Sequence, residues 1–483
     1  MKKTIIAAAA LALIAAGAQG KSFKRGVSEN QFSIGAQLRA LEPGVSWYYT
    51  WGNTAPKGYQ NQIIDFEGMD FVPMCWNGNY SADNIREYVK SHPQCKYLLG
   101  FNEPNFKAQA NMTPADAAEK WKAVKALADE LGLQLVAPAL NYSPDAPYQD
   151  PTQWMDEFVA LVGEDAFDFT AVHNYGGFGG LKALATTFHE RYGKPVWVTE
   201  FCYWPGEQNG VTVTPAAQIA SMVESVEWLE QTPFIYRYAW FKPIGASSQA
   251  SNSPNYGLLL QQQGLEESFL SEQGKVYVHL PDFDTGRYHA TETRFEATDY
   301  ASRSYAAIGA GNNADCPVPI EISQFTSGAT VDWQFDVPAE GNYTLTLQVS
   351  GEGDPVRFDP KLAVYSVADD GTQGSCLTEA ETYKLSGKND TYTTLSFPMT
   401  LTAGRQRIRL RDEDPYRPSG IRISTVSLTN SAGIGGISAD GASAVDVYSI
   451  DGTCVRRAVD RDNAAVGLPR GLYIIGGKKV IVK

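Results

Sequence analysis

The sequence predicts an α/β fold, a (β/α)8 TIM barrel, followed by a β-sandwich domain and a small C-terminal β module. Two observations carry this prediction. Between residues 21 and 285, short apolar runs alternate with helical stretches such as 113–131 and 215–230, which is typical of βαβ units in a parallel sheet. Beyond Tyr288 the helical periodicity stops and short alternating segments appear, separated by Gly, Pro and Asp.

Seven apolar runs of the first domain are clear strand candidates, one fewer than a closed eight-stranded barrel needs. We expect the missing strand at 62–66, the best remaining run. The seven clear candidates are 44–49, 70–76, 97–102, 134–139, 168–174, 195–199 and 235–240.

The remaining sequence divides into two β-rich parts. Residues 286–430 contain five alternating segments and are expected to form the sandwich. Residues 431–483 begin with a Ser/Gly-rich linker and continue into a module with Asp451-Gly452 as a hairpin turn. The sandwich segments are 330–337, 341–349, 363–367, 392–401 and 405–411.

The N-terminus has the pattern of a secretory signal peptide over residues 1–20. Lys2 and Lys3 precede an apolar stretch, and Ala18-Gln19-Gly20 fits a cleavage site. The apolar stretch is shorter than the roughly 20 residues that span a bilayer. We therefore expect a secreted or cell-surface protein without membrane insertion.

Charge limits the classes of molecule that this protein could bind, and cysteine content limits its disulfides. A net charge of −14 makes nucleic acid an improbable ligand. Six cysteines are too few for a disulfide scaffold, although a Cys75–Cys95 or a Cys316–Cys376 bridge is compatible with export and the sequence does not decide between thiols and disulfides. We expect a monomer.

Two glutamates indicate the chemistry. Glu103, in Asn102-Glu103-Pro104, and Glu200 each end an apolar run, and Pro104 cannot continue a strand ladder. The ends of barrel strands form the active site, and two facing carboxylates are what cleavage of a glycosidic bond requires. We expect a separation of about 5 Å, as in retaining glycosidases.

The alternation along the strand before Glu200 gives an expectation for its neighbours. Val196 and Val198 share the parity of Glu200 and should point into the barrel, whereas Trp197 and Thr199 should face the helices.

Other polar and aromatic residues at strand ends are candidates for substrate binding. Each has a structural alternative: a glutamate at a strand end is more often solvated, His173 is as readily a satisfied structural histidine, and Trp47 and Trp76 are more readily core residues. Trp240 is the tryptophan that we favour as a sugar platform. The substrate-binding candidates are Asn102, His173, Tyr175, Trp240, Trp47 and Trp76.

Other chemistries lack their motifs. HExxH, P-loop and GxSxG patterns are absent, and no His, Asp or Glu cluster has the spacing of metal ligands. We therefore predict neither a metal nor a cofactor for catalysis.

Six ordered motifs of the first domain resemble glycoside hydrolase family 128 of clan A. The resemblance implies a (β/α)8 barrel that cleaves β-1,3-glucan with retention of configuration. The motifs are Gly-Val-Ser-Trp-Tyr-Tyr-Thr-Trp-Gly (44–52), Phe-Val-Pro-Met-Cys-Trp (71–76), Leu-Leu-Gly-Phe-Asn-Glu-Pro-Asn (98–105), Ala-Val-His-Asn-Tyr (171–175), Val-Trp-Val-Thr-Glu-Phe (196–201) and Tyr-Ala-Trp-Phe (238–241).

The same resemblance implies roles for individual residues. Glu103 would be the acid/base and Glu200 the nucleophile. Asn102 would contact the sugar 2-hydroxyl, Tyr175 would orient Glu200, and Trp240 would stack under the sugar at the cleavage point.

The later domains carry fainter resemblances. Residues 286–430 resemble β-sandwich carbohydrate-binding modules, with Trp333, Tyr365 and Tyr416 as residues that could stack on sugar or belong to the core. Residues 437–483 resemble the C-terminal sorting modules of secreted bacterial enzymes.

Three functions remain open on the sequence. The first is an endo-acting β-1,3-glucanase with laminarin-like substrates. The second is a non-catalytic glucan-binding surface protein on a barrel scaffold, which the presence of both glutamates disfavours. The third is a clan A glycosidase for β-1,4-glucan or mannan.

Overall fold

The computed structural model describes most of the chain. Four predicted features lie outside the described residues: the signal peptide, the strand at 62–66, the Asp451-Gly452 turn and nearly all of the linker. The described residues are 21–57, 68–205, 213–244, 256–260, 270–311, 316–352, 359–385, 391–416, 420–431, 444–449, 454–460, 464–475 and 478–482.

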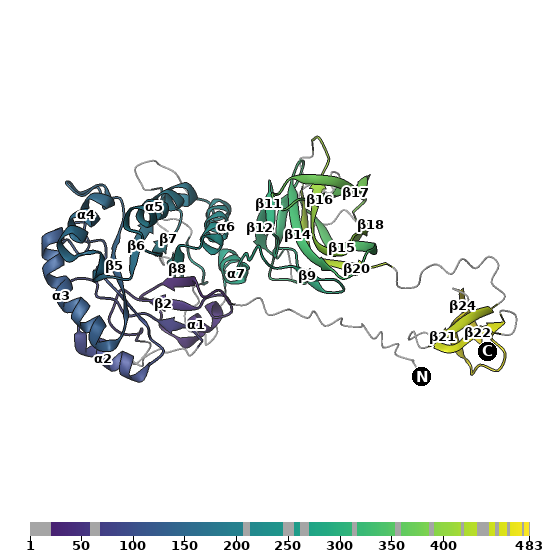
Figure 1. Cartoon of the computed structure of the whole chain (residues 1–483), viewed down its shortest axis with the longest axis horizontal. Helices are drawn as coiled ribbons and strands as arrows, with labels where there is room; N and C mark the ends of the chain where they lie inside the picture. The colour runs from purple at the N-terminus through teal and green to yellow at the C-terminus, as the bar shows by residue number, and fades with distance from the viewer. Residues whose placement is uncertain are drawn as a thin grey trace.

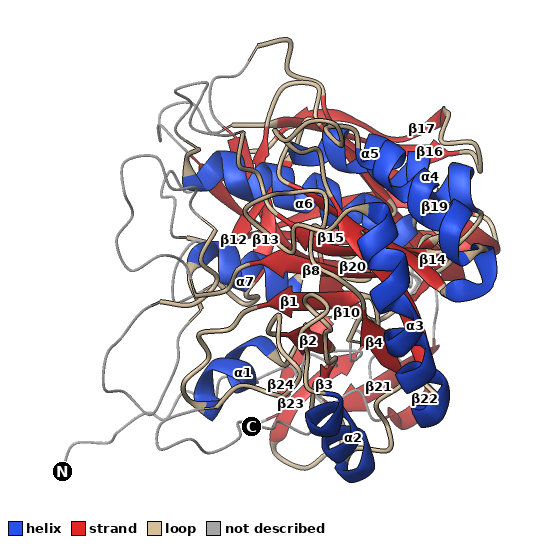
Figure 2. Cartoon of the chain, turned by 90° about the vertical axis from the view of Figure 1, so that its left-hand side faces the viewer, coloured by secondary structure: helices blue, strands red, loops and turns tan. Residues whose placement is uncertain are grey.

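The first part of the chain contains eight parallel strands in the order β3-β2-β1-β8-β7-β6-β5-β4, with helices outside them (Figures 1 and 2). A parallel bridge between Met74, just after β3, and Leu99 of β4 joins the two ends of this order. The arrangement is consistent with the predicted (β/α)8 barrel. The strands are β1 (Arg25–Ser28), β2 (Trp47–Tyr49), β3 (Asp70–Phe71), β4 (Tyr97–Leu99), β5 (Gln134–Leu140), β6 (Phe169–Asn174), β7 (Val196–Phe201) and β8 (Ile235–Phe241).

Seven helices accompany these strands in the described residues. Four of them, α2, α3, α6 and α7, begin at a Ser or Thr whose side chain accepts a hydrogen bond from the backbone of the first turn, which is a favourable cap. The helices are α1 (Gly35–Leu41), α2 (Ala82–Ser91), α3 (Pro114–Leu131), α4 (Pro151–Val162), α5 (Gly177–Tyr192), α6 (Pro215–Gln231) and α7 (Glu272–His279).

The eighth strand of this order is β1, a segment that was not among the strand candidates. β1 pairs with β2 on one side and β8 on the other. It contains Arg25, Gly26 and Ser28 and therefore lacks an apolar pattern. Gly26 is required by packing, because a Cβ there would lie 2.3 Å from the ring of Trp47.

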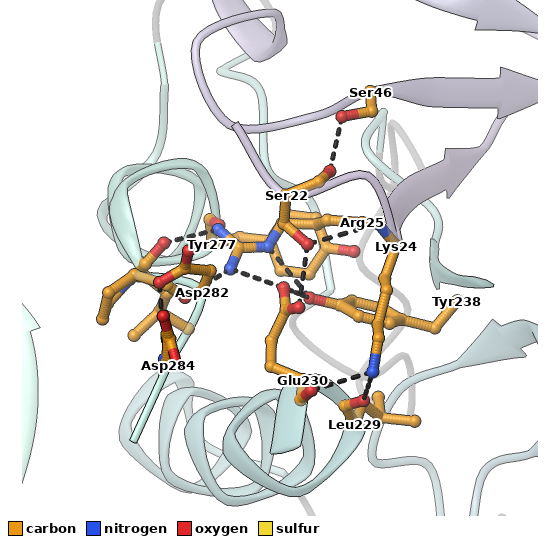
Figure 3. A network of polar contacts seen from close by, with 12 residues as sticks. Ser22, Lys24, Arg25, Ser46, Leu229, Glu230, Tyr238, Tyr277, Asp282 and Asp284 are labelled. Atoms are coloured by element: carbon orange, nitrogen blue, oxygen red, sulfur yellow. Dashed lines mark hydrogen bonds and ion pairs between the residues drawn. The ribbon is translucent and has the colours of Figure 1, made fainter. Parts of the chain in front are cut away.

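A buried polar network fastens β1 to the helices (Figure 3). The guanidinium of Arg25 forms an ion pair with Glu230 of α6 at 3.1 Å, and both side chains are almost fully buried. It also donates to Tyr238 of β8 at 3.0 Å and to the carbonyl of Tyr277 of α7 at 3.0 Å. A buried charge is tolerated only when it is paired and hydrogen-bonded in this way.

The second part of the chain consists of two six-stranded sheets, in agreement with the predicted change to β structure. Buried side chains of both sheets, such as Leu345 and Ile408, belong to one hydrophobic cluster. The strands are β9 (His289–Ala290), β10 (Arg294–Glu296), β11 (Ser302–Ser304), β12 (Ala307–Ala310), β13 (Ile320–Phe325), β14 (Thr330–Val337), β15 (Gly341–Glu352), β16 (Lys361–Val367), β17 (Gln373–Thr382), β18 (Thr393–Leu401), β19 (Gly404–Asp412) and β20 (Gly420–Asn430).

The two parts are in direct contact through α6 and α7, which pack against β12. Figure 1 shows these elements between the barrel and the sheets. Glu227 of α6 pairs with Arg303 of β11 at 2.8 Å and accepts a hydrogen bond from Tyr300.

The C-terminal part forms a four-stranded sheet in the order β22-β21-β23-β24 with a small core that includes Val447 and Tyr473. Its role in sorting stays a prediction, as do the domain boundaries at 285 and 430. The strands are β21 (Ala444–Ser449), β22 (Cys454–Asp460), β23 (Gly471–Ile475) and β24 (Lys478–Val482).

Neither of the two disulfides considered from the sequence is present: Cys75 is not bonded to Cys95, nor Cys316 to Cys376. Within the described part of the chain, no helix is both long and apolar enough to cross a membrane.

Candidate active site

Glu103 lies where the chain turns sharply after β4. The backbone N–H groups of Asn102 and Glu103 donate to the carbonyls of Trp76 and Ala139, both at 2.9 Å, so this segment still follows the neighbouring barrel strands. Glu103 itself has a positive φ of 40°, a region that costs free energy for a residue with a Cβ. Fixed backbone partners therefore hold a strained residue at the strand end.

Glu200 is placed by an irregularity in β7. Val172 of β6 pairs with Val198, but the next residue, His173, pairs with Glu200, so Thr199 is the extra residue of a bulge. Trp197 belongs to the cluster inside the barrel, whereas Val198 packs in the cluster that includes helix residues. The predicted parity of Val196, Val198 and Trp197 is thus wrong, and the bulge places Glu200 on the inward-facing side of β7.

The imidazole of His173 connects the two glutamates. Its Nδ1 lies 2.9 Å from Oε1 of Glu103, and its Nε2 lies 3.5 Å from Oε1 of Glu200. The ring is completely buried and Nε2 has no hydrogen-bond partner. Both carboxylates therefore contact one ring, from opposite nitrogens.

Three further side chains donate to Glu200. Trp51 Nε1 lies 2.7 Å and Tyr49 Oη 3.1 Å from Oε1, and Tyr175 donates to Oε2. The contact predicted between Tyr175 and Glu200 is therefore present. These donors, from the ends of β2 and β6, fix both oxygens of Glu200.

The electrostatics of the site reflect its burial. Burial raises the pKa of Glu200, and the charge of Glu103 raises it further, while His173, Tyr175 and Trp51 act in the opposite direction. Burial alone would lower the pKa of His173, but the charge of Glu200 and the hydrogen bond to Glu103 outweigh it, so this pKa lies above its ordinary value. Glu200 and His173 therefore both retain a proton to a higher pH than they would in water.

Glu103 and Glu200 open into a cleft of about 480 Å³. Three of the predicted binding residues, Asn102, Tyr175 and Trp76, line it as well. The amide nitrogen of Asn102 donates to Gln109 at 3.3 Å, whereas its oxygen is buried without a hydrogen-bond partner. An unpaired buried acceptor beside two carboxylates is suited to a hydroxyl of a ligand.

The other three predicted binding residues do not line the cleft. Trp240 is 0% exposed, donates to the carbonyl of Tyr256 and packs against Tyr277 of α7, so its assignment as a sugar platform is wrong. Its neighbour Phe241, which points to the other face of β8, lines the cleft instead. Trp47 is buried against Trp197 inside the barrel. His173 is buried in contact with the two carboxyl groups and does not itself face the cleft.

Five lining residues were not among the predicted site residues. Trp51 continues the alternation Trp47, Tyr49, Trp51 of inward-facing aromatic residues, a signal that could have identified it. To identify Phe241, it is necessary to know which residues of β8 face the inside of the barrel. The five are Asn30, Trp51, Gln109, Trp204 and Phe241.

Within the described residues, no three His, Cys, Asp or Glu side chains gather in an arrangement that could hold a metal ion.

A comparison with protein-family models matches residues 26–277 to the glycosyl hydrolase catalytic core. The chain belongs to this family. The match spans β1 to α7 and includes both glutamates of the cleft. The protein is thus a glycoside hydrolase.

Solved structures similar to this glycoside hydrolase include family 128 endo-β-1,3-glucanases. It is 34% identical to a subgroup II endo-β-1,3-glucanase from Pseudomonas viridiflava, over 54% of this chain and 98% of that one, with a TM-score of 0.47. It is 33% identical to a subgroup II endo-β-1,3-glucanase from Sorangium cellulosum, over 53% and 98%, with a TM-score of 0.45.

A third structure is a subgroup I endo-β-1,3-glucanase from Amycolatopsis mediterranei in complex with laminaritriose. It is 29% identical over 49% of this chain and 96% of that one, with a TM-score of 0.39. A comparison with curated proteins finds no match. The family 128 resemblance inferred from the six motifs agrees with these relatives.

Proposed function

We propose that this glycoside hydrolase is an exported, endo-acting β-1,3-glucanase of family 128 that retains anomeric configuration. The observation that carries the proposal is the pair Glu103 and Glu200, which share His173 and open together into one cleft. Two carboxylates facing one site are the minimum that glycosidic bond cleavage requires.

In the proposed first step, Glu103 donates its proton to the glycosidic oxygen as the bond to the anomeric carbon breaks. Glu200 attacks that carbon and forms a glycosyl ester. Tyr49, Trp51 and Tyr175 hold the Glu200 carboxylate in one orientation for the attack. Holding the nucleophile in place lowers the entropic part of the barrier.

In the proposed second step, Glu103 removes a proton from water, which attacks the anomeric carbon and releases Glu200. Ester formation has by then removed the charge of Glu200, which favours ionised Glu103. The hydrogen bond between Glu103 and His173 allows a proton to reside on either side chain. His173 is thus proposed as a positioning residue that helps to hold the proton required at the start.

Two observations support a β-1,3-glucan as the substrate. The relatives described above are named endo-β-1,3-glucanases, and at 34% identity the sequence match covers 98% of the first. Besides Tyr175, four aromatic side chains line the cleft and offer apolar faces to pyranose rings: Trp51, Trp76, Trp204 and Phe241.

The proposal is tested by measuring reducing-sugar release from laminarin, carboxymethyl-cellulose and mannan with the mature chain and with Glu200→Ala. We expect activity on laminarin alone, abolished by the substitution. Proton NMR during hydrolysis should show the β-anomer first if configuration is retained, and the α-anomer would contradict retention.

The same assay separates the alternatives. Cleavage of mannan or cellulose alone would contradict β-1,3-glucan as the substrate but would still agree with a glycosidase activity. Retention of the protein by laminarin in an affinity gel without any hydrolysis would favour a glucan-binding protein. Large fragments released early would support endo action, whereas steady release of glucose would contradict it.

We also propose that the second domain binds sugar through Tyr416, which is 83% exposed. Trp333 is in the core and cannot serve, and Tyr365 is half-buried against Glu413. In the full chain, Tyr416→Ala should weaken binding to insoluble β-1,3-glucan about threefold to tenfold. Tyr305→Ala, which alters an equally exposed tyrosine, is the control; equal loss in both variants would contradict the assignment.

Export and sorting are proposals from the terminal patterns. Fractionation of the source cells, with an antibody to the barrel, should find the mature chain at the cell surface or in the medium and its N-terminus after residue 20. Recovery of the full-length chain from the cytoplasm would contradict export.

A further inference from the structure

A third glutamate, Glu29, lies at the same end of the barrel as the catalytic pair. It follows β1 directly, and its side chain is completely buried. It does not line the cleft and contacts neither Glu103 nor Glu200 in any interaction described for the site. A buried carboxylate is costly, so the groups that satisfy it indicate its role.

The partners of Glu29 belong to two different loops. Its Oε1 accepts from the backbone N–H of Gln31 at 2.9 Å, and its Oε2 accepts from the backbone N–H of Ile244 at 2.8 Å. Lys242 Nζ lies 3.5 Å from Oε1. The carboxylate therefore ties the segment after β1 to the segment after β8.

These partners only partly compensate for burial. Burial raises the pKa of Glu29, whereas Lys242 and the two backbone donors lower it. The backbone N–H of Glu29 also donates to the carbonyl of Tyr49 at 3.0 Å, which continues the β1–β2 ladder. The main chain of Glu29 is therefore fixed to β2, whereas its carboxylate is bonded to the segment after β8.

Both tied segments contribute to the cleft. Asn30 and Phe241 lie next to Glu29 and Lys242 in the chain, and both line the cleft. The ring of Phe241 also lies edge-on to Tyr175 and Trp51, with centroids 5.4 and 5.9 Å apart, and these two residues donate to Glu200. A shift of the segment after β8 would change this side of the cleft.

We propose that Glu29 is a positioning residue that fixes the side of the cleft formed by Asn30 and Phe241 and so determines affinity for the glucan chain. The inference rests on the proposed function, because it concerns the binding of that substrate. Glu29 touches no reacting atom and acts through the two segments that it joins.

The decisive variant is Glu29→Gln, which keeps the volume but replaces one acceptor oxygen by an amide that cannot accept from a backbone N–H. A buried N–H then loses its partner, and one segment must move. We expect the KM for laminari-oligosaccharides to rise about fivefold with kcat within about twofold, since chemistry at Glu103 and Glu200 is unaltered.

The matched control is Glu321→Gln in β13. Glu321 is also completely buried, pairs with Arg422 at 3.0 Å and accepts from Tyr392 at 2.9 Å, but it lies in the second domain. Its variant should lower the melting temperature without changing KM. A rise in KM specific to Glu29→Gln separates positioning from a general loss of stability.

Lys242→Met provides a second variant if Glu29→Gln folds poorly. It removes the ion pair but leaves both backbone donors in place, so its KM should rise less, by about twofold. An unchanged KM in both variants, or a fall in kcat at constant KM, would overturn the inference. A wild-type enzyme inactive on laminarin would instead overturn the proposed function, so the two failures are distinguishable.

Discussion

Where the barrel strands begin, Arg25 and Glu230 are buried as an ion pair with all their neighbours supplied by the chain, whereas at the opposite end Glu103 and Glu200 are buried beside an open cleft. The first pair has opposite charges in contact. The second consists of two carboxyl groups with one histidine between them.

The difference indicates that the two ends of the barrel serve different purposes: the Arg25–Glu230 end stabilises the fold, and the Glu103–Glu200 end is suited to chemistry. Opposite charges that are hydrogen-bonded on all sides hold β1 between β2 and β8. At the cleft, burial raises the pKa of Glu200 and the charge of Glu103 raises it further, so an ionised Glu200 costs free energy there. Substitutions at the two ends should therefore affect different measurements.

The largest effect is expected for Glu200→Gln. Loss of the proposed nucleophile should lower kcat on laminarin by at least about 10⁴-fold. The melting temperature should stay the same or rise, because the amide removes a buried charge of raised pKa. Calorimetry alongside the reducing-sugar assay checks both, and a clear loss of stability would contradict the division between the ends.

Arg25→Met should have the reverse effect. It leaves the Glu230 carboxylate buried without its cation and should lower the free energy of unfolding by about 3–5 kcal/mol. Urea denaturation measures this loss, and kcat of the folded protein should be unchanged. Adding Glu230→Gln should restore part of the stability; a double variant no better than the single one would show that the pair is not the cause.

Trp240 and Phe241 sharpen the comparison along one strand. Trp240→Ala should cost about 3–5 kcal/mol of stability, because its ring is fully buried. Phe241→Ala should instead raise the KM for laminari-oligosaccharides about fivefold with a smaller loss of stability. Melting curves and steady-state kinetics of both variants test this, and a KM effect confined to Trp240→Ala would reverse our placement.

His173 should give the smallest effect, visible as a pH dependence. Its pKa is raised in the folded state, so the stability it contributes is present below its ordinary value of 6.5 and is lost as the pH rises through the folded pKa. Urea midpoints of the wild type should therefore fall as the pH increases above 6.5. In His173→Asn this decline should be weaker, and an identical decline would assign it to other groups.

Much of the barrel could be predicted from the sequence because most strands are buried on both faces and therefore read as apolar runs. β1 could not be predicted, because its residues are explained by contacts with distant parts of the chain. Arg25 pairs with Glu230, and Gly26 leaves room for the ring of Trp47. A pattern within a segment contains no information on such distant partners.

The site shows the same limit. Glu103 and Glu200 were identifiable because a carboxylate at the end of an apolar run stands out. The neighbours that share the cleft with them depend on which face of its strand each side chain points to. The bulge at Thr199 reverses this alternation in β7, and no sequence pattern indicates the bulge. Trp240 is the residue predicted from the sequence as a sugar platform, but the alternation of β8 directs Phe241 into the cleft instead.

The position of β1 also constrains the order of assembly. The first strand of the barrel is the neighbour of the last, and the ion pair of Arg25 joins residues 205 positions apart in the chain. Among the barrel strands β1 is synthesised first, and it must therefore wait for nearly the whole barrel before its second edge is paired. Contacts of such long range slow folding, so ring closure is the step at which a chaperone would assist this protein.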